Sequence, residues 1–229
     1  MKIVSWNVHR CIGTDGKYRP DRIAEGLTSF RADVVALQEI DSSLRVSDGT
    51  DQLAYLAAAL GMHVVMAPTL ELDYGAYGNA LLSKEAFSSF EEFDLSYRRF
   101  EPRGALKAQT HYGEMSVQVV VTHLGLKYWE RSYQIDQLMK KVEWKSQTLS
   151  VLLGDFNEWY SWGENTRELE RRFLRSPRLG TFPSRWPSLP LDRILIRGWD
   201  GPIFYEVPKN KLTQVASDHL PLVAKLQLS

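Results

Sequence analysis

The chain has 229 residues, of which 44% are hydrophobic and 24% are charged, so it is long enough to bury one large apolar core. Lys and Arg together number 28, as do Asp and Glu, so the net charge is zero and no global field gathers nucleic acid or anionic lipid. These numbers weigh against a nonspecific nucleic-acid binder and leave room for an enzyme with a local basic site. We expect one domain over residues 1–229 and a monomer.

The single cysteine, Cys11, excludes an intramolecular disulfide, which fits a reducing compartment. The N-terminal segment MKIVSWNVHR lacks the apolar stretch of a signal peptide. No uncharged run approaches the roughly 20 residues that a membrane-spanning helix needs. We therefore expect a cytoplasmic protein with no transmembrane segment.

Short apolar runs alternate with helix-like stretches in the first half of the chain. Runs rich in β-branched and large apolar residues predict strands over 2–8, 33–39, 63–67, 79–83 and 87–93. Helical spacing of apolar residues predicts helices over 20–30, which opens with Pro20, and over 51–60, which stops at Gly61.

The second half repeats this alternation. It predicts helices over 129–142 and 164–174, and strands over 105–111, 116–123, 150–153, 191–196, 203–207 and 220–228. The Pro-rich segment 181–190 (TFPSRWPSLP) is short and aromatic, which indicates an ordered loop. Strands outnumber helices roughly two to one, which favours an α/β fold of two packed sheets with helices outside.

Polar residues able to do chemistry recur at the ends of the predicted strands. They are Asn7 and His9, Glu39, His123, Asp155 and Asn157, Asp192, and the run Ser217-Asp218-His219. Residues two apart in an extended segment point to the same side. We therefore expect Asn7 to share a face with His9, and Asp155 with Asn157.

Each of these residues has a structural as well as a functional interpretation. Asp155 or Asp218 taken alone is explained by a turn, because Asp bonds its own backbone. At Asp155 the preceding Gly154 also tolerates a positive φ. Glu39 directly follows the apolar run VVALQ, where a buried carboxylate needs a partner such as a cation. Acids, amides and imidazoles without cysteine ligands indicate Mg²⁺ or Mn²⁺ rather than zinc.

Seven short motifs in order along nearly the whole chain resemble those of the endonuclease/exonuclease/phosphatase superfamily. They are SWNV, LQE, GNALLS, THL, GDFN, LDRI and SDHLP. The resemblance implies a four-layered α/β sandwich of the DNase I-like type, in which two mixed β-sheets pack face to face between flanking helices. It also implies hydrolysis of a phosphate ester at a metal site at one end of the sandwich.

The resemblance further implies roles for individual residues. Asn7, Glu39 and Asp218 would form the metal end of the site, with Mg²⁺ as the cofactor and Mn²⁺ as a substitute. Asp155 would accept a proton from the attacking water or help bind a metal, Asn157 would donate to a phosphate oxygen, and His219 would contact the phosphate while Asp192 orients it. His123 would bind phosphate or protonate the leaving oxygen, and His9 and Arg103 would bind the phosphate.

The sequence also bears on the class of substrate. Some members of the superfamily that cut DNA carry an acid where this chain has His9, and no basic extension is present to track a duplex. The resemblance is strongest to small bacterial members grouped near phospholipid-metabolising proteins. We therefore expect a Mg²⁺-dependent phosphodiesterase acting on a small or lipid phosphodiester. A nuclease acting on DNA or RNA, and a catalytically inactive interaction module, are the alternatives.

Four tryptophans lie in segments that flank the motifs: Trp129, Trp159, Trp162 and Trp186. Exposed aromatic side chains there would stack on a base or cover an acyl chain. We interpret each of them instead as packing between layers.

Overall fold

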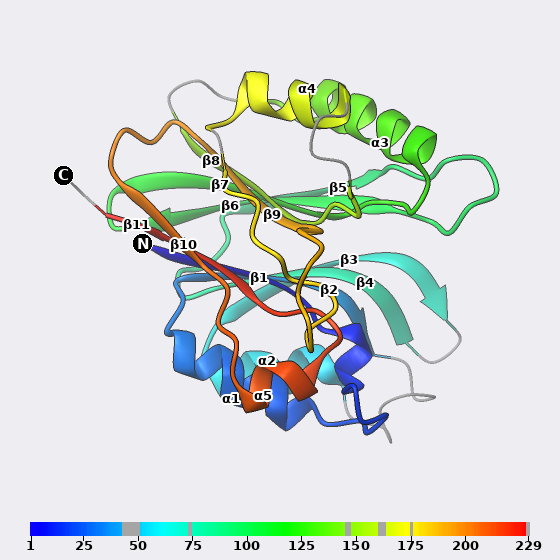
Figure 1. Ribbon diagram of the computed structural model, residues 1–229. Coiled ribbons are helices and arrows are strands. Elements are labelled where there is room, and N and C mark those ends of the chain that lie inside the picture. The colour runs from blue at the N-terminus through cyan, green and yellow to red at the C-terminus, as the bar shows by residue number, and fades with distance from the viewer. Residues whose placement is uncertain (43–50, 73–74, 145–147, 160–163, 175, 228–229) are drawn as a thin grey trace.

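The computed structural model describes residues 1–42, 51–72, 75–144, 148–159, 164–174 and 176–227 (Figure 1). The strands are β1 (Lys2–Asn7), β2 (Val34–Asp41), β3 (His63–Leu72), β4 (Gly75–Ser83), β5 (Ser89–Asp94), β6 (Gly104–Tyr112), β7 (Met115–His123), β8 (Leu149–Asp155), β9 (Asp192–Arg197), β10 (Ile203–Glu206) and β11 (Leu222–Leu226). The helices are η1 (His9–Cys11, a 3₁₀ turn), α1 (Pro20–Phe30), α2 (Gln52–Leu60), α3 (Tyr128–Lys141), α4 (Glu164–Arg172) and α5 (Lys211–Ala216).

The strands form two mixed sheets. The six-stranded sheet has the order β10-β11-β1-β2-β4-β3, and the five-stranded sheet has the order β5-β6-β7-β8-β9. Figure 1 shows the two sheets face to face, with α3 and α4 covering one outer face and α1, α2 and α5 covering the other. This is the four-layered α/β sandwich that the sequence predicts.

Alternation along the strands creates three apolar layers. Ile3, Ala36, Leu81, Val119 and Ile194 lie among the residues packed between the two sheets. Their neighbours on the opposite faces pack against helices, as Val4 and Val35 do against α1, and Val120 and Leu195 against α3 and α4. A period of two residues thus supplies both the interior of the sandwich and its two helix-covered faces.

The topology brings several strand ends together at one edge of the sandwich. In the six-stranded sheet β1 runs parallel to β2, so the ends that carry Asn7 and Glu39 lie side by side. In the other sheet β7 runs parallel to β8, and His123 is the register partner of Asp155. Because β9 and β11 run antiparallel to their neighbours, their starts lie at this same edge, next to Asp192 and His219.

The predicted elements are confirmed, with small differences at their ends. Asp51 caps α2, its side chain accepting from the backbone N–H groups of Leu53 and Ala54, and Gly61 closes the helix at φ 63°. The prediction omitted η1 and α5, which are too short for an apolar period to show. The last residues of the predicted strand 220–228 lie outside the described residues. The described part of the chain has no helix long and apolar enough to cross a membrane.

Candidate active site

The Asp155 carboxylate lies at the centre of the polar cluster. Its Oδ2 accepts a hydrogen bond from Asn7 Nδ2 at 3.2 Å and lies 3.5 Å from His123 Nε2 and 3.6 Å from His219 Nε2. Burial is the main reason that the pKa of Asp155 is raised to about 6; nearby Asp192 raises it further, whereas His219 opposes the shift. One carboxylate oxygen therefore joins side chains from both sheets.

Glu39 reaches the same edge through an irregularity in β2. The register between β2 and β4 shifts between Leu37 and Ile40, and Glu39 itself has φ 59°. A bulge of this kind re-aims a side chain that regular alternation would turn elsewhere. Asn7 Nδ2 donates to Glu39 Oε1 at 2.9 Å, so the Asn7 amide bridges the carboxylates of Glu39 and Asp155.

His219 is held by an acid and a hydroxyl that are both buried. Its Nδ1 lies 2.9 Å from Asp192 Oδ2, and Thr181 Oγ1 donates to that same oxygen at 2.5 Å. Burial lowers the pKa of His219, but Asp192 and Asp155 outweigh burial and raise the pKa to about 10. The imidazole is therefore positively charged at neutral pH, which suits contact with an anion.

His123 carries its proton on the nitrogen that faces Asp155. The guanidinium of Arg103 can only donate, and its Nη1 lies 3.1 Å from His123 Nδ1, so Nδ1 is the acceptor. Burial, Arg103 and His219 lower the pKa of His123 well below its ordinary value, so the ring is neutral. We therefore assign the single ring proton to Nε2, which faces Asp155 Oδ2. In this tautomer the Asn157 amide, 3.2 Å from Nε2, makes no hydrogen bond to the ring.

Arg103 is buried, and its second terminal nitrogen donates to Glu101 Oε2 at 3.2 Å. The guanidinium is thus engaged by His123 and Glu101. A direct contact between Arg103 and phosphate stays a prediction.

The prediction that Asn7 shares a strand face with His9, and Asp155 with Asn157, is wrong, because neither pair lies in one extended segment. β1 ends at Asn7, and His9 follows in a 3₁₀ turn at φ 46°; β8 ends at Asp155, and Asn157 follows at φ 48°. Both segments turn because the side chain at the end of the strand accepts a hydrogen bond from the backbone N–H two residues further along. Asn7 Oδ1 accepts from His9, and Asp155 Oδ1 accepts from Asn157. At GDFN the turn and the cluster are therefore one structure.

Asn157 nevertheless reaches the cluster from its turn. Its Nδ2 donates to the Leu124 carbonyl oxygen at 2.9 Å and lies 3.2 Å from His123 Nε2. The remaining two predicted residues are less closely joined to the cluster. His9 Nδ1 contacts the Ile12 carbonyl oxygen, and Asp218 Oδ1 lies 3.3 Å from Ser217 Oγ. Within the described residues, no hydrogen bond or ion pair links the His9 or Asp218 side chain to Glu39 or Asp155.

Sequence reasoning assigned no role to the residues that support the cluster. Thr181 holds Asp192, and Ser217 Oγ donates to the Asn7 carbonyl oxygen at 2.7 Å while accepting from the His219 N–H. The ring of Phe182 lies 4.8 Å from that of His219. One feature of the sequence could have pointed to Thr181 and Phe182. They lie in an ordered loop, rich in Pro and aromatic residues, that directly precedes the LDRI motif.

The carboxylate and amide oxygens at this edge of the sandwich suit a hard cation, such as Mg²⁺, that needs few protein ligands. No group of three His, Cys, Asp or Glu side chains in the described ranges is arranged to hold a metal ion. Mg²⁺ keeps several waters and needs only one or two carboxylates together with substrate phosphate. The partly exposed Glu39 carboxylate beside Asn7 meets that requirement, whereas the Cys11 thiol is buried against Gln52.

Three of the four flanking tryptophans are exposed. Trp129, Trp159 and Trp186 are 56%, 51% and 61% accessible, so the interpretation that they pack between layers is wrong. Trp129 lies in the first turn of α3, whereas Trp159 and Trp186 lie in connecting segments. Trp162 lies outside the described residues.

Known proteins resemble this chain in sequence and in fold. A relative from Escherichia coli (strain K12), the uncharacterized protein YbhP, is 25% identical and covers 100% of this chain and 96% of its own. A functionally unknown conserved protein from Enterococcus faecalis V583 superposes with a TM-score of 0.81 at 21% identity, covering 100% of both chains. The Bacteroides thetaiotaomicron mannosyl-6-phosphatase superposes with a TM-score of 0.74 at 16% identity, again over 100% of both chains.

A family model matches the chain over residues 4–219, which include every candidate residue from Asn7 to His219. The structural neighbours share the two-sheet sandwich described above. The family is one of phosphoesterase-type hydrolases, which agrees with a cluster of acids, amides and imidazoles at the edge of the sandwich. The chain belongs to the Endonuclease/Exonuclease/phosphatase family.

Proposed function

We propose that this protein is a Mg²⁺-dependent phosphodiesterase that hydrolyses a small or lipid-derived phosphodiester. The observation that carries the proposal is the convergence of Asn7, His123 and His219 on one oxygen of Asp155. Hydrolysis of a phosphate ester needs a base for water, donors for the phosphate oxygens and neutralisation of charge. Side chains able to fill each of these roles lie within this cluster.

We assign the metal end to Glu39, with Asn7 and Asp218 as further ligands either directly or through water. When bound, Mg²⁺ would neutralise charge on the phosphate. Mn²⁺ would substitute because it prefers the same oxygen ligands.

We assign the proton and phosphate contacts to the remaining residues. Asp155 would accept the proton of the attacking water. His219, oriented by Asp192, would donate to a phosphate oxygen, and Asn157 would use the amide proton that the Leu124 carbonyl does not take. His123 would donate through Nε2 to the phosphate or the leaving oxygen, held in that tautomer by Arg103. His9 and Arg103 remain candidates for additional phosphate contacts.

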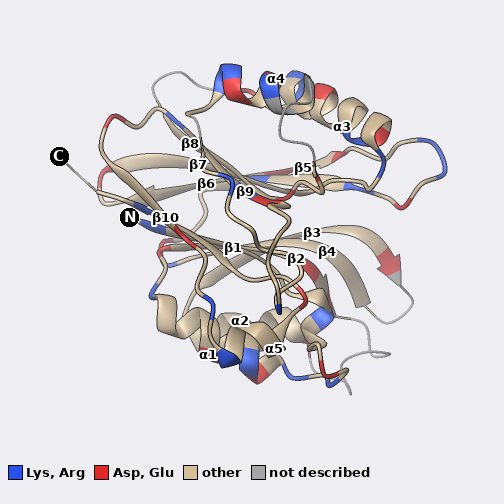
Figure 2. Cartoon of the chain, in the orientation of Figure 1, with Lys and Arg blue, Asp and Glu red and all other residues tan. Residues whose placement is uncertain are grey.

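The charge distribution supports a small substrate over a nucleic acid. The net charge is zero, and Figure 2 shows Lys and Arg interspersed with Asp and Glu on the outer helices. A duplex would instead be held by a continuous basic surface.

The test is hydrolysis of four substrates with Mg²⁺ or Mn²⁺: bis-p-nitrophenyl phosphate, p-nitrophenyl phosphate, a plasmid and phospholipid vesicles. We expect turnover of the diester that EDTA and Asp155→Ala abolish. The matched control is Asp136→Ala, which removes an exposed carboxylate from α3. A preference for p-nitrophenyl phosphate would indicate a monoesterase, as the name of the Bacteroides neighbour suggests.

Two other results would change the assignment. Cleavage of the plasmid with binding that falls steeply with salt would favour a nuclease. A folded protein with no turnover on any of the four substrates would contradict the proposal and favour an interaction module.

A further inference from the structure

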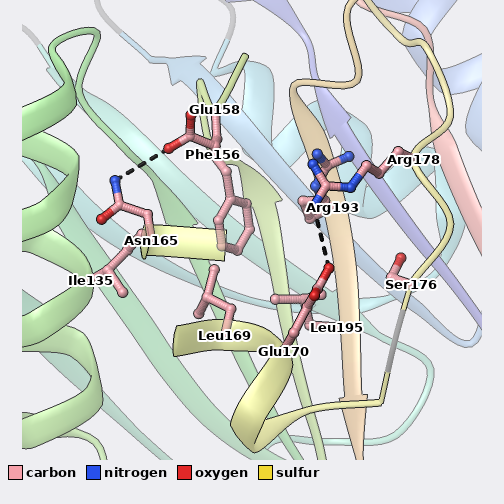
Figure 3. A pocket seen from close by; sticks show the side chains of 10 residues that line it. All are labelled: Ile135, Phe156, Glu158, Asn165, Leu169, Glu170, Ser176, Arg178, Arg193 and Leu195. Carbon is pink, nitrogen blue, oxygen red and sulfur yellow. Dashed lines mark hydrogen bonds and ion pairs between the residues drawn. The ribbon is translucent and has the colours of Figure 1, made fainter. Parts of the chain in front are cut away.

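A second polar site lies on the opposite face of β9, away from the cluster. A cavity of about 30 Å³ lies between β9, α3, α4 and the segments that follow β8 and α4 (Figure 3). Its walls combine apolar side chains, such as Phe156 and Leu195, with the guanidinium groups of Arg178 and Arg193. Because side chains alternate along β9, Asp192 turns toward His219 while Arg193 turns to this cavity.

Arg193 is a buried cation whose two terminal nitrogens lack hydrogen-bond partners among the described residues. The residue is only 7% exposed, and neither Nη1 nor Nη2 has a hydrogen-bond partner within the part of the chain that the structure describes. Burial and the neighbouring Arg178 lower the pKa of Arg193 to about 10, while Asp192, Glu158 and Glu170 oppose the shift, so the group remains charged at neutral pH. A buried charge of this kind needs a counter-charge with hydrogen-bond acceptors.

The carboxylates that line the cavity are already paired with other arginines. Glu158 lies 3.3 Å from Arg131 Nε and accepts from Asn165 Nδ2, and Glu170 lies 3.3 Å from Arg178 Nη2. The pairs with Asn165 and Arg178 are drawn in Figure 3. Glu158 and Glu170 also attract Arg193 electrostatically, but among the described residues neither carboxylate is hydrogen-bonded to its terminal nitrogens.

We propose that this cavity binds one small oxyanion, held by the two terminal nitrogens of Arg193. A guanidinium presents parallel N–H groups that match the two oxygens of a carboxylate or phosphate. The apolar walls strengthen this attraction because they exclude water. The volume restricts the ligand to a small ion of the size of formate, which the cavity would hold without opening the α4 layer.

The position of the cavity distinguishes it from the active site. Phe156 and Glu158, which line it, flank Asn157 in the chain, so the bound ion would lie behind the loop that carries Asn157. The ion would make no contact with the Asp155 cluster.

The probe is ¹³C-labelled formate, observed by NMR line broadening in metal-free protein with EDTA and chloride at constant ionic strength. We expect broadening with the wild-type protein and with Arg171→Met, which removes an exposed arginine of α4. We expect none with Arg193→Met. His219→Gln should bind formate as the wild type does, because the active site is not involved.

A thermal measurement tests the same site independently. Formate should raise the unfolding midpoint of the wild type relative to equal chloride, because it binds the folded state only. The rise should vanish in Arg193→Met. If that variant does not fold, weaker binding of formate by Arg178→Met, which changes another residue of the cavity wall, provides the test.

Three outcomes would overturn the proposal. They are the absence of broadening in the wild type, equal broadening by folded Arg193→Met, and an effect of formate no larger than that of chloride. Each would mean that the Arg193 nitrogens are satisfied by water.

Discussion

His219 and Asp192 form a buried pair, with Nδ1 of the imidazole 2.9 Å from Oδ2 of the carboxylate. The two residues come from different sheets: Asp192 starts β9, and His219 precedes β11. The pair therefore fixes an imidazole belonging to one sheet by means of a carboxylate belonging to the other.

The first prediction concerns pH. The pKa of His219 is raised from 6.5 to about 10 by Asp192 and Asp155 in spite of burial, so the folded state keeps a proton that the unfolded state releases. This contribution to stability is complete below pH 6.5 and is lost as the pH rises toward 10. Urea titrations of the metal-free protein should show the free energy of unfolding falling across this window. His219→Gln should flatten the fall, and an unchanged slope would contradict the assignment.

The second prediction concerns Thr181, whose hydroxyl donates to Asp192 Oδ2. Thr181→Val should lower stability by about 1 kcal/mol, the usual net value of a buried hydrogen bond. It should also lower turnover and shift the pH–rate profile, because Asp192 then orients His219 less firmly. Thr181→Ser keeps the hydroxyl and should restore both. A variant that loses stability but keeps the wild-type pH profile would leave Thr181 a purely structural role.

The third prediction concerns the glycine of GDFN. Gly154 has φ 140°, and a Cβ there would lie 1.8 Å from the Thr122 carbonyl oxygen on β7. Gly154→Ala should therefore destabilise the fold by about 3 kcal/mol or more. Gly113→Ala is the matched control, since it also has positive φ but open surroundings and should cost about 1 kcal/mol. Denaturant titrations compare the two, and equal losses would show that φ alone matters.

The fourth prediction concerns the metal. Glu39→Gln keeps the shape of the side chain but removes the charge that would hold Mg²⁺, so affinity and turnover should fall together. Titration calorimetry with Mn²⁺ measures the affinity directly, and circular dichroism checks the fold. Unchanged affinity in a folded variant would remove Glu39 from the metal site.

The fifth prediction concerns Cys11. Burial raises the pKa of this thiol to about 12, and its Sγ faces Gln52 Oε1 at 3.5 Å. The thiolate is the reactive form, so a disulfide reagent near neutral pH should label the folded protein very slowly. Unfolding in guanidinium should release one fast-reacting thiol. Rapid labelling without denaturant would show that the region around η1 opens locally.

Much of this site could be predicted because its residues follow apolar runs. Asn7, Glu39, His123 and Asp155 each come at the end of a strand whose β-branched residues are visible in the sequence, and parallel pairing brings such ends together. The short polar connections around α5 carry no comparable pattern. That helix spans only Lys211–Ala216 and depends on the Asn210 cap, which accepts from Leu212 and Thr213.

The supporting contacts depend on tertiary packing and have no local signal. Nothing near Glu39 indicates that a bulge re-aims it, and the tautomer of His123 depends on Arg103, twenty residues earlier in the chain. The alternation of β9 could have indicated that Arg193 faces away from Asp192. The sequence could not indicate that the terminal nitrogens of Arg193 lack a partner, because this depends on how α3 and α4 pack around the side chain.

The bond between Asn7 and Asp155 has a consequence for how activity responds to perturbation. It joins β1 of one sheet to β8 of the other, at the edge of an interior in which apolar side chains such as Ile3 and Val119 pack. Sliding of one sheet over the other would separate these residues while every ladder of backbone hydrogen bonds stayed intact. Turnover is therefore a reporter of sheet alignment, and mild denaturant should abolish it before circular dichroism changes.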